Sequence, residues 1–191
     1  MTVFFTSDSH FNDHRVIFMY GRPFASTGPM DEAMVARWNE TVGPDDTVWH
    51  LGDFAVRLNE RRVDDLLLRL NGRKHLIAGN NDGPAVLKSA GWETVSAYAE
   101  ITVDGTHLVL CHYAFRTWNG MHRKSINLHG HSHGRLAPLL RQFDVGVDAW
   151  NLAPVTLPQL LASRPARRAP AKKGAHYAEP GPAPPEHARA R

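Results

Sequence analysis

The stretch V-F-F-T-S-D-S-H, residues 3–10, sets a pattern that the rest of the chain repeats: an apolar run followed by an acidic residue and a histidine. A run of this kind predicts a short strand whose end reaches the edge of a sheet. Asp8 and His10 are two residues apart, so an extended backbone would direct both side chains to the same side, and the same holds for His131 and His133 in G-H-S-H. We therefore expect the first strand to present a carboxylate and an imidazole together.

Four later segments repeat this arrangement. The segments L-G-D-F, A-G-N-N-D, L-C-H-Y and H-G-H-S-H each follow an apolar stretch and carry carboxylate, amide or imidazole groups. A lone histidine on an apolar strand is more often a hydrogen-bonded core or surface residue, but five such segments in one chain favour metal ligation. The candidate metal ligands are Asp8, His10, Asp53, Asn80, His112, His131 and His133.

The donor atoms of these side chains indicate the class of metal. Carboxylate, imidazole and amide oxygen suit divalent manganese, iron, zinc or nickel, and the single cysteine, Cys111, is better explained as a packed side chain. The set can surround two ions if Asp53 bridges them. Two ions about 3.5–4 Å apart clamp a phosphate and lower the pKa of a bridging water. The residues therefore predict phosphoester hydrolysis.

The order of the five segments resembles the calcineurin-like metallophosphoesterases, and the resemblance spans residues 1 to about 157. Finer features resemble a small single-domain bacterial and phage branch of that family. These features are F-T-S-D-S-H-F, G-R-P-F, H-L-G-D-F-A, H-Y-A-F-R-T-W-N-G, L-H-G-H-S-H-G and V-G-V-D-A-W-N. The resemblance implies a four-layer α/β/β/α sandwich, whereas the sequence pattern alone indicates only an α/β fold.

The resemblance also implies two ligand sets that share Asp53. They are Asp8, His10, Asp53 and His133 for one metal, and Asp53, Asn80, His112 and His131 for the other. It further implies hydrolysis of phosphomono- or phosphodiesters, by attack of a metal-bridging hydroxide, on a small phosphorylated substrate or a nucleotide. The alternatives are a nuclease or cyclic-nucleotide phosphodiesterase, or a non-catalytic metal-binding scaffold.

Asn81 departs from the family pattern, in which the third motif usually reads G-N-H-D or G-N-H-E. The family's histidine at this place is assigned to contact the phosphate and protonate the leaving group. Asparagine can donate a hydrogen bond but is no general acid near neutral pH. We take Asn81 and His14 as catalytic candidates, and the proton donor stays open among His14, His122, Asp82 and water.

The segment between His112 and His131 carries two candidate substrate-binding residues. Arg116 could bind a phosphate with both guanidinium nitrogens, and Trp118 could stack on a base or another flat group. A surface ion pair is the alternative for Arg116, and an apolar anchor for the loop is the alternative for Trp118. Arg22, in G-R-P-F, is a weaker phosphate-binding candidate.

The composition fits one soluble domain. A chain of 191 residues, 42% of them hydrophobic, can form one domain with a real core. No apolar run approaches the roughly 20 residues needed to cross a bilayer. The N-terminus does not resemble a secretory signal, and one cysteine cannot form an internal disulfide. These features favour a cytoplasmic protein with no membrane partner.

Residues 163–191 differ from the rest in charge and composition. They hold seven Lys or Arg against two Glu, a net charge of +5, so the formal total of +3 leaves −2 for residues 1–162. They also hold six of the 13 prolines, which predicts a disordered tail behind a domain of residues 1–162. Nucleic acid is a candidate partner of the tail, and a solvated linker is the alternative.

The periodicity of apolar residues predicts strands that alternate with helices in the first half, hence a largely parallel sheet. In the second half, Asp104 and Gly105 predict a hairpin, so a mixed sheet is expected there. The expected strands are 3–7, 47–51, 75–78, two within 98–112, 126–128 and 142–147, and the expected helices are 30–42 and 60–70.

Overall fold

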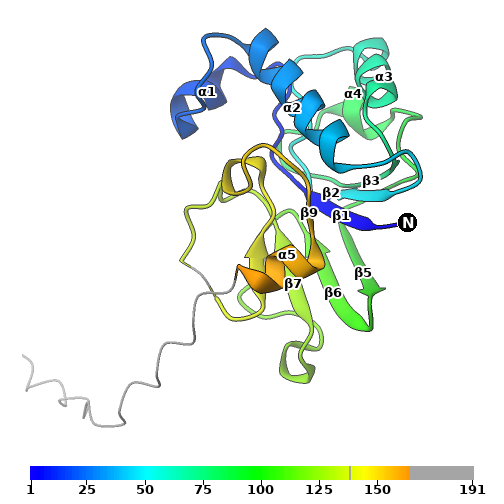
Figure 1. The fold of residues 1–191 in the computed structure, drawn as a ribbon, viewed down its shortest axis with the longest axis vertical. Coiled ribbons are helices and arrows are strands. Elements are labelled where there is room, and N and C mark those ends of the chain that lie inside the picture. Colours follow the sequence, from blue (N-terminus) through cyan, green and yellow to red (C-terminus); the bar gives the residue numbers. More distant parts are fainter. Residues whose placement is uncertain (138, 164–191) are drawn as a thin grey trace, which may run out of the picture.

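The first sheet consists of four parallel strands and one antiparallel edge strand. In the computed structural model (Figure 1), which describes residues 1–137 and 139–163, the order of its strands is β4-β3-β2-β1-β9. Strands β1 to β4 are parallel, and β9 pairs antiparallel with β1. The bounds are β1 Val3–Thr6, β2 Thr47–His50, β3 Arg73–Ile77, β4 Thr94–Ser96 and β9 Val155–Thr156.

The second sheet is mixed, with the order β5-β6-β7-β8. The predicted hairpin is confirmed: β5 and β6 are antiparallel, and Asp104 and Gly105 turn between them with φ of 49° and 73°. Two positive φ values are typical of the tight hairpin turn. Strand β7 pairs in parallel with β6, and β8 pairs in parallel with β7. The bounds are β5 Tyr98–Val103, β6 Thr106–Cys111, β7 Ile126–His129 and β8 Gln142–Asp144.

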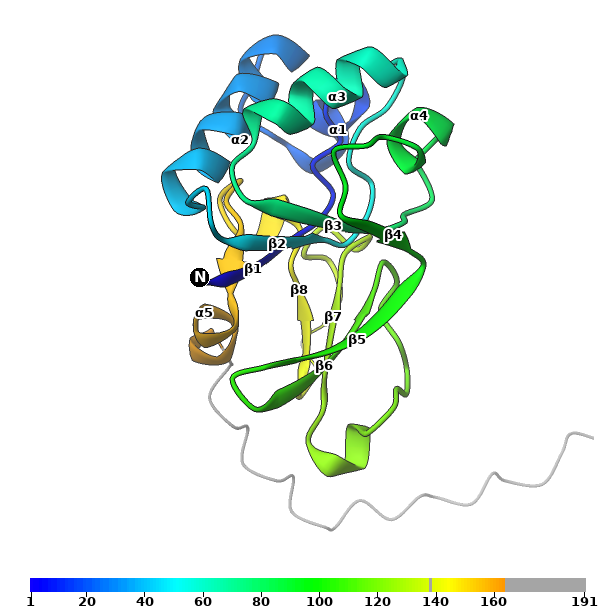
Figure 2. The ribbon, with the colours of Figure 1, turned by 90° about the vertical axis from the view of Figure 1, so that its right-hand side faces the viewer.

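Successive side chains of β1 face two different cores, as the alternation of a strand requires. Phe4 packs with helices α2 (Thr27–Thr41) and α3 (Glu60–Arg69), whereas Phe5 packs with the second sheet. Figure 2 shows both helices on one side of the first sheet and the second sheet on the other. This layering confirms the predicted α/β fold class.

The far side of the second sheet is covered by a loop rather than by a long helix. Asn127 of β7 accepts a hydrogen bond from the Phe115 backbone N–H at 3.2 Å, and the buried indole of Trp118 donates to the Ser125 carbonyl at 3.3 Å. The loop contains only the short 3₁₀ helix η1 (Met121–Arg123). The outermost layer of the expected sandwich is therefore thin.

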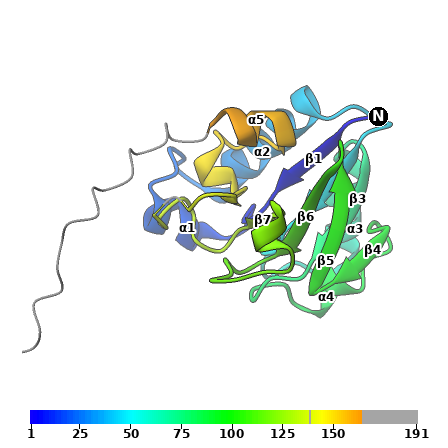
Figure 3. The ribbon, with the colours of Figure 1, turned by 90° about the horizontal axis from the view of Figure 1, so that it is seen from below.

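Helix α5 (Leu157–Ala162) closes one edge of the core between the sheets, beside β1 (Figure 3). It was not predicted, and neither were β4, β9, η1, α4 (Pro84–Leu87) and the 3₁₀ helix η2 (Val147–Ala149). All are between 2 and 6 residues long, too short for apolar periodicity to appear.

Helix α1 (His14–Tyr20) lies in a stretch for which apolar periodicity predicts neither a helix nor a strand. Asp13 caps its first turn by accepting a hydrogen bond from the Arg15 N–H, and Gly21 ends it with φ of 66°. Both cap residues are visible in the sequence. The helix escapes prediction because Phe18 is 82% exposed, so its apolar residues do not form one buried stripe.

Helix α2 begins at Thr27, earlier than the expected Met30. Pro29 lies in the first turn of the helix, where a backbone N–H has no partner within the helix, so the proline is tolerated there. The predicted tail, residues 163–191, lies outside the described residues apart from Ser163. Within the described residues, no helix combines the length and apolar character needed to cross a membrane.

Candidate metal centre

All seven candidate ligands follow the carboxyl ends of β1, β2, β3, β6 or β7, as predicted. The strands of each group are parallel, so these ends meet at one edge of each sheet. The two edges are joined at the site itself, because the His131 backbone N–H donates to the Asp8 carboxylate at 2.9 Å. The topology thus brings residues from both halves of the chain together.

Left-handed backbone positions five of these seven side chains. The φ angles are 57° at Asp8, 51° at His10, 56° at Asp53, 64° at His131 and 48° at His133. Residues other than glycine adopt this region uncommonly, and such strained positions cluster at functional sites. The extended backbone expected over D-S-H and H-S-H is therefore wrong. β1 ends at Thr6, and each pair lies in a tight loop.

The loop conformation sends His131 and His133 into different clusters rather than to the same side. The first cluster consists of Asp8, His10 and His133, whose ligand atoms lie within 4.8 Å of one another. All three side chains are buried, and His133 Nε2 lies 3.8 Å from Asp8 Oδ1. Burial raises the pKa of Asp8 well above its ordinary value, so its charged form needs a nearby cation.

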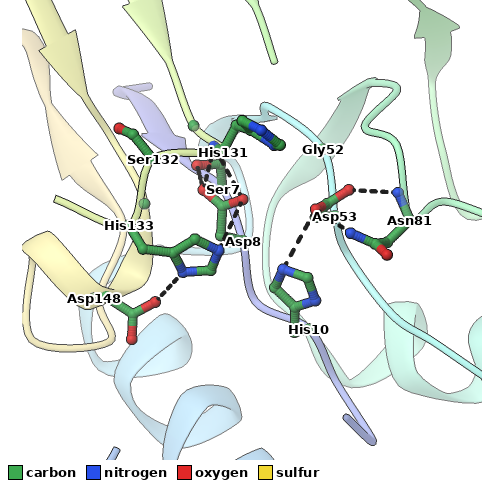
Figure 4. Close-up of polar contacts among 12 residues, drawn as sticks. Ser7, Asp8, His10, Gly52, Asp53, Asn81, His131, Ser132, His133 and Asp148 are labelled. Carbon is green, nitrogen blue, oxygen red and sulfur yellow. Dashed lines mark hydrogen bonds and ion pairs between the residues drawn. The ribbon is translucent and has the colours of Figure 1, made fainter. Parts of the chain in front are cut away.

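His10 has two buried ring nitrogens, and neither has a hydrogen-bond partner among the described residues. Its Nε2 faces Asp53 Oδ2 at 3.4 Å, a contact drawn as a dashed line in Figure 4, and its Nδ1 lies 3.6 Å from Asp13 Oδ2. A buried polar atom without a partner costs about 1–3 kcal/mol. A divalent cation at Nε2 would supply the missing partner, so the residues of this cluster fit a metal ion.

The second cluster consists of Asp53, His112 and His131. His112 Nδ1 donates to the Leu51 carbonyl at 2.7 Å, so its Nε2 directs a lone pair into the site. That atom faces two further acceptors, Asn80 Oδ1 at 3.1 Å and Asp53 Oδ2 at 3.6 Å. Three converging acceptor atoms also fit a cation. Unlike the first cluster, this one opens outward, because Asn80 and His131 are exposed.

Asp53 lies between the two clusters, and Asn81 holds it there. The Asn81 backbone N–H donates to Asp53 Oδ1 at 2.8 Å, and its side-chain amide donates to Oδ2 at 2.7 Å. Burial alone would raise the pKa of Asp53, but the imidazoles of His10 and His112 and the two bonds from Asn81 hold it below its ordinary value. Asp53 is therefore a carboxylate, and Asn81 positions it.

Glycines leave the space that the two central carboxylates occupy. A Cβ atom at Gly79 would lie 2.3 Å from Asp53 Oδ1, and one at Gly130 would lie 2.6 Å from Asp8 Oδ2. Both distances are far shorter than a van der Waals contact. The G-N-N-D and G-H-S-H segments need glycine for this close approach, which sequence spacing alone does not reveal.

Arg22 is buried and fully engaged, so the expectation that it binds phosphate is wrong. It donates to the carbonyls of Asp8 and Ser9 at 2.7 and 2.8 Å, and to both oxygens of Asp148 at 2.8 and 2.9 Å. Asp148 in turn accepts a hydrogen bond from His133 Nδ1 at 2.6 Å (Figure 4). Burial opposes its ionisation, but His133 and Arg22 lower the pKa of Asp148 to about 2.

Asp148 was not predicted as a site residue, although it lies in the quoted V-G-V-D segment. Its partner Arg22 is 126 positions away, and no local pattern links the two.

Asp82, a candidate proton donor, also has a structural role. Its carboxylate accepts three backbone N–H groups, from Asp53, Phe54 and Gly79, and so fixes the loops that carry the second cluster.

Among the described residues, no hydrogen bond, ion pair or ring contact joins the remaining candidates to either cluster. His14 is the first residue of α1 and is exposed, and His122 is exposed on η1. Arg116 is also exposed, with no hydrogen bond or ion pair to other described residues. Trp118 is buried at 8% exposure, which fits its alternative as an anchor of the loop.

Comparisons with known proteins agree with this geometry. A family model for the calcineurin-like phosphoesterase superfamily domain matches residues 1–144. The Gene 66 protein of Mycobacterium phage D29 is 33% identical over 181 residues, which cover 78% of this chain and 89% of that protein. An uncharacterised protein of Methanocaldococcus jannaschii is 26% identical over 163 residues, covering 81% and 86%.

Among solved structures, a protein of unknown function from Aquifex aeolicus has a similar fold. Its TM-score is 0.68 at 20% sequence identity, and the match covers 84% of this chain and 97% of that one. The likeness concerns the fold alone. On the family match over residues 1–144 and the phage relative, the chain belongs to the calcineurin-like phosphoesterase superfamily.

Proposed function

We propose that this protein hydrolyses phosphomono- or phosphodiesters with the help of two divalent cations held by the two clusters. The observation that carries the proposal is the position of Asp53. Its Oδ2 faces His10 Nε2 at 3.4 Å on one side and His112 Nε2 at 3.6 Å on the other. A carboxylate between two imidazole lone pairs is the arrangement that a pair of bridged cations requires.

The ligand sets follow from the clusters. Asp8, His10, Asp53 and His133 would hold one cation, and Asp53, Asn80, His112 and His131 would hold the other. Manganese, iron, zinc and nickel all suit these donor atoms. When bound, such a pair neutralises charge on a phosphate group and lowers the pKa of an attacking water.

Substrate would enter from the side of the second cluster. Asn80 and His131 are exposed there, and the neighbouring Tyr113 is 46% exposed with its hydroxyl donating to Asn80 Oδ1 at 3.3 Å. Arg116 follows three residues after Tyr113 and is free to reach a phosphate. The side chains of the first cluster are buried by contrast, so a substrate would first meet the second cluster.

Asn81 keeps Asp53 in place but cannot supply a proton to a leaving group. Water would then take this role, or an exposed histidine such as His14 if α1 moves. We therefore expect good leaving groups to be favoured. The same reasoning applies to a nuclease or a cyclic-nucleotide phosphodiesterase, which would use the same chemistry on a different substrate.

The test is turnover of bis-p-nitrophenyl phosphate by protein stripped with chelator and reloaded with Mn²⁺. Asp53→Asn should reduce kcat by about 10²–10³-fold, because it removes the negative charge that would lie between the two cations, and loss of one electrostatic group from an active site has an effect of this size. Asp45→Asn, at an exposed carboxylate outside the clusters, is the matched control and should leave kcat unchanged. Equal turnover by wild type and Asp53→Asn, or none by the reloaded wild type on any phosphate ester, would refute the proposal.

A further inference from the structure

The two clusters differ in what supports their histidines. His133 Nδ1 donates to the Asp148 carboxylate at 2.6 Å, and Tyr20 stacks on the His133 ring at a centroid distance of 3.5 Å and an angle of 9°. These two contacts fix the orientation of the ring and the tautomer in which Nε2 has a free lone pair. A carboxylate behind a ligating histidine also makes the imidazole a stronger donor to a metal.

Arg22 extends this support to the other side of the first cluster. Its guanidinium binds Asp148 and also the carbonyls of Asp8 and Ser9, so one buried group fixes the backbone of Asp8 and, through Asp148, the ring of His133. The contact joins segments that are far apart in the sequence. Asp8 and His133 are thus held in place before any cation arrives, and ligands held in this way lose less conformational entropy on binding.

The second cluster lacks such support. His112 Nδ1 donates to a neutral carbonyl, that of Leu51, rather than to a carboxylate. His131 is exposed, its ring lies against the rings of His112 and Tyr113 at centroid distances of 5.1 and 4.8 Å, and among the described residues no carboxylate forms a hydrogen bond with that ring. The neutral amide of Asn80 replaces a second carboxylate. Asp53 is therefore the single anionic ligand of this cluster, while the first cluster has Asp8 as well.

We infer that the two cation positions are unequal: the position at Asp8, His10 and His133 fills first and holds its cation more tightly, and Asp148 is the positioning residue behind this difference. The inference rests on the proposed function, because it assumes the same two clusters. The outer position, at His112 and His131, is then the exchangeable one. It is also the position that faces entering substrate.

The inference is tested by titrating Mn²⁺ into the full-length apoprotein, with calorimetry for the affinities and electron paramagnetic resonance for free Mn²⁺. We expect two steps whose Kd values differ by at least about 10-fold. His133→Ala should abolish the tighter step, and His131→Ala the weaker one. Asp148→Asn should weaken the tighter step by about 10–100-fold and change the weaker step little. Asp148→Glu should restore part of the lost affinity.

Asp31→Asn is the matched control, because Asp31 is a partly buried carboxylate that belongs to neither cluster and whose hydrogen bonds to other described residues come only from the Asn12 backbone N–H. It should leave both steps unchanged. Two equal steps, loss of the tighter step in His131→Ala, or equal weakening of both steps in Asp148→Asn would overturn the inference while leaving the proposed function intact. The two histidine variants decide the question even if Asp148→Asn does not fold. A wild-type protein that binds no Mn²⁺ would overturn both.

Discussion

Asn81 holds both carboxylate oxygens of Asp53, with its backbone N–H 2.8 Å from Oδ1 and its side-chain amide 2.7 Å from Oδ2. The family usually has histidine at this place. In this chain the residue positions Asp53 and has no acidic proton to give to a leaving group. Asparagine in place of histidine thus separates two tasks, orientation of the Asp53 carboxylate and protonation of a leaving group.

Restoring a histidine should change how the rate depends on the leaving group. We expect Asn81→His to accelerate hydrolysis of alkyl phosphate esters by about 10²-fold or more, and of nitrophenyl esters much less, because only poor leaving groups need a general acid. The measurement is kcat/KM over a series of esters of increasing leaving-group pKa. Identical slopes for wild type and variant would contradict this role, and Mn²⁺ titration of both proteins controls for loss of the amide bond to Asp53.

The candidate site was more predictable than the surrounding fold because each candidate ligand lies in a short segment that directly follows a strand. Asp53 in L-G-D-F and His112 in L-C-H-Y show this clearly. The supporting residues have no such local signal. Arg22 is recognisable as a structural residue only once the fold brings it against Asp148, 126 positions away.

The fold itself was predictable where an element was long enough to show its period. Helix α3 begins and ends within a residue of the expected 60–70, because Val63, Leu66 and Leu67 form one buried face. Helix α1 does not show this, since Phe18 points to solvent. Asp8 and His10 do lie in one cluster, as predicted, but the extended backbone expected for D-S-H was wrong, because the left-handed backbone at both residues depends on hydrogen bonds to the distant loop at Gly52 and Asp53.

Gly130 should be irreplaceable for steric reasons. A Cβ atom there would lie 2.2 Å from Ser7 Oγ and 2.6 Å from Asp8 Oδ2, so Gly130→Ala must displace the Asp8 carboxylate. We expect a loss of about 1–3 kcal/mol in unfolding free energy, and weaker Mn²⁺ binding at the first cluster. Gly83→Ala is the matched control, because no atom lies within 4 Å of its Cβ position. If chemical denaturation and Mn²⁺ titration give the same result for both variants, the crowding is not real.

Trp118 should act as an anchor of the loop over the second sheet. Trp118→Ala is expected to lower the unfolding free energy by about 3–5 kcal/mol, because the side chain is buried and its indole N–H loses the Ser125 carbonyl. Trp118→Phe should keep KM within about twofold of wild type. A large increase in KM for the Phe variant, with unchanged stability, would instead support stacking on the substrate.

Arg116 should act on substrate rather than on stability. Because its side chain is exposed and has no partner among the described residues, Arg116→Ala should change the unfolding free energy by less than about 0.5 kcal/mol. If it binds the phosphate, KM should rise about 10-fold while kcat changes less. Arg37→Ala, at an exposed arginine of α2, is the comparison. Equal KM values in the two variants would remove Arg116 from the substrate site.

His50 should make the fold sensitive to acid. It is fully buried, its Nε2 forms a hydrogen bond with Ser9 Oγ at 2.7 Å, and its Nδ1 accepts a hydrogen bond from the Gly52 N–H at 3.2 Å. A proton added to Nδ1 would break the bond from Gly52. Burial lowers the pKa of His50 from 6.5 to about 3. Between these values the unfolded chain binds more protons, so stability falls as pH drops below 6.5, by on the order of 5 kcal/mol at pH 3.

Asp31 changes the pH dependence of the unfolding free energy in the opposite direction, so the two residues must be measured separately. Burial raises the pKa of Asp31 to about 6, so from about pH 4 to 6 the folded state binds more protons and stability falls as pH rises. The two effects partly cancel in the wild type. Urea unfolding of His50→Gln and Asp31→Asn at several pH values separates them: relative to wild type, the first should lose less stability on acidification and the second more. Parallel curves for all three proteins would show that neither group titrates as its surroundings require.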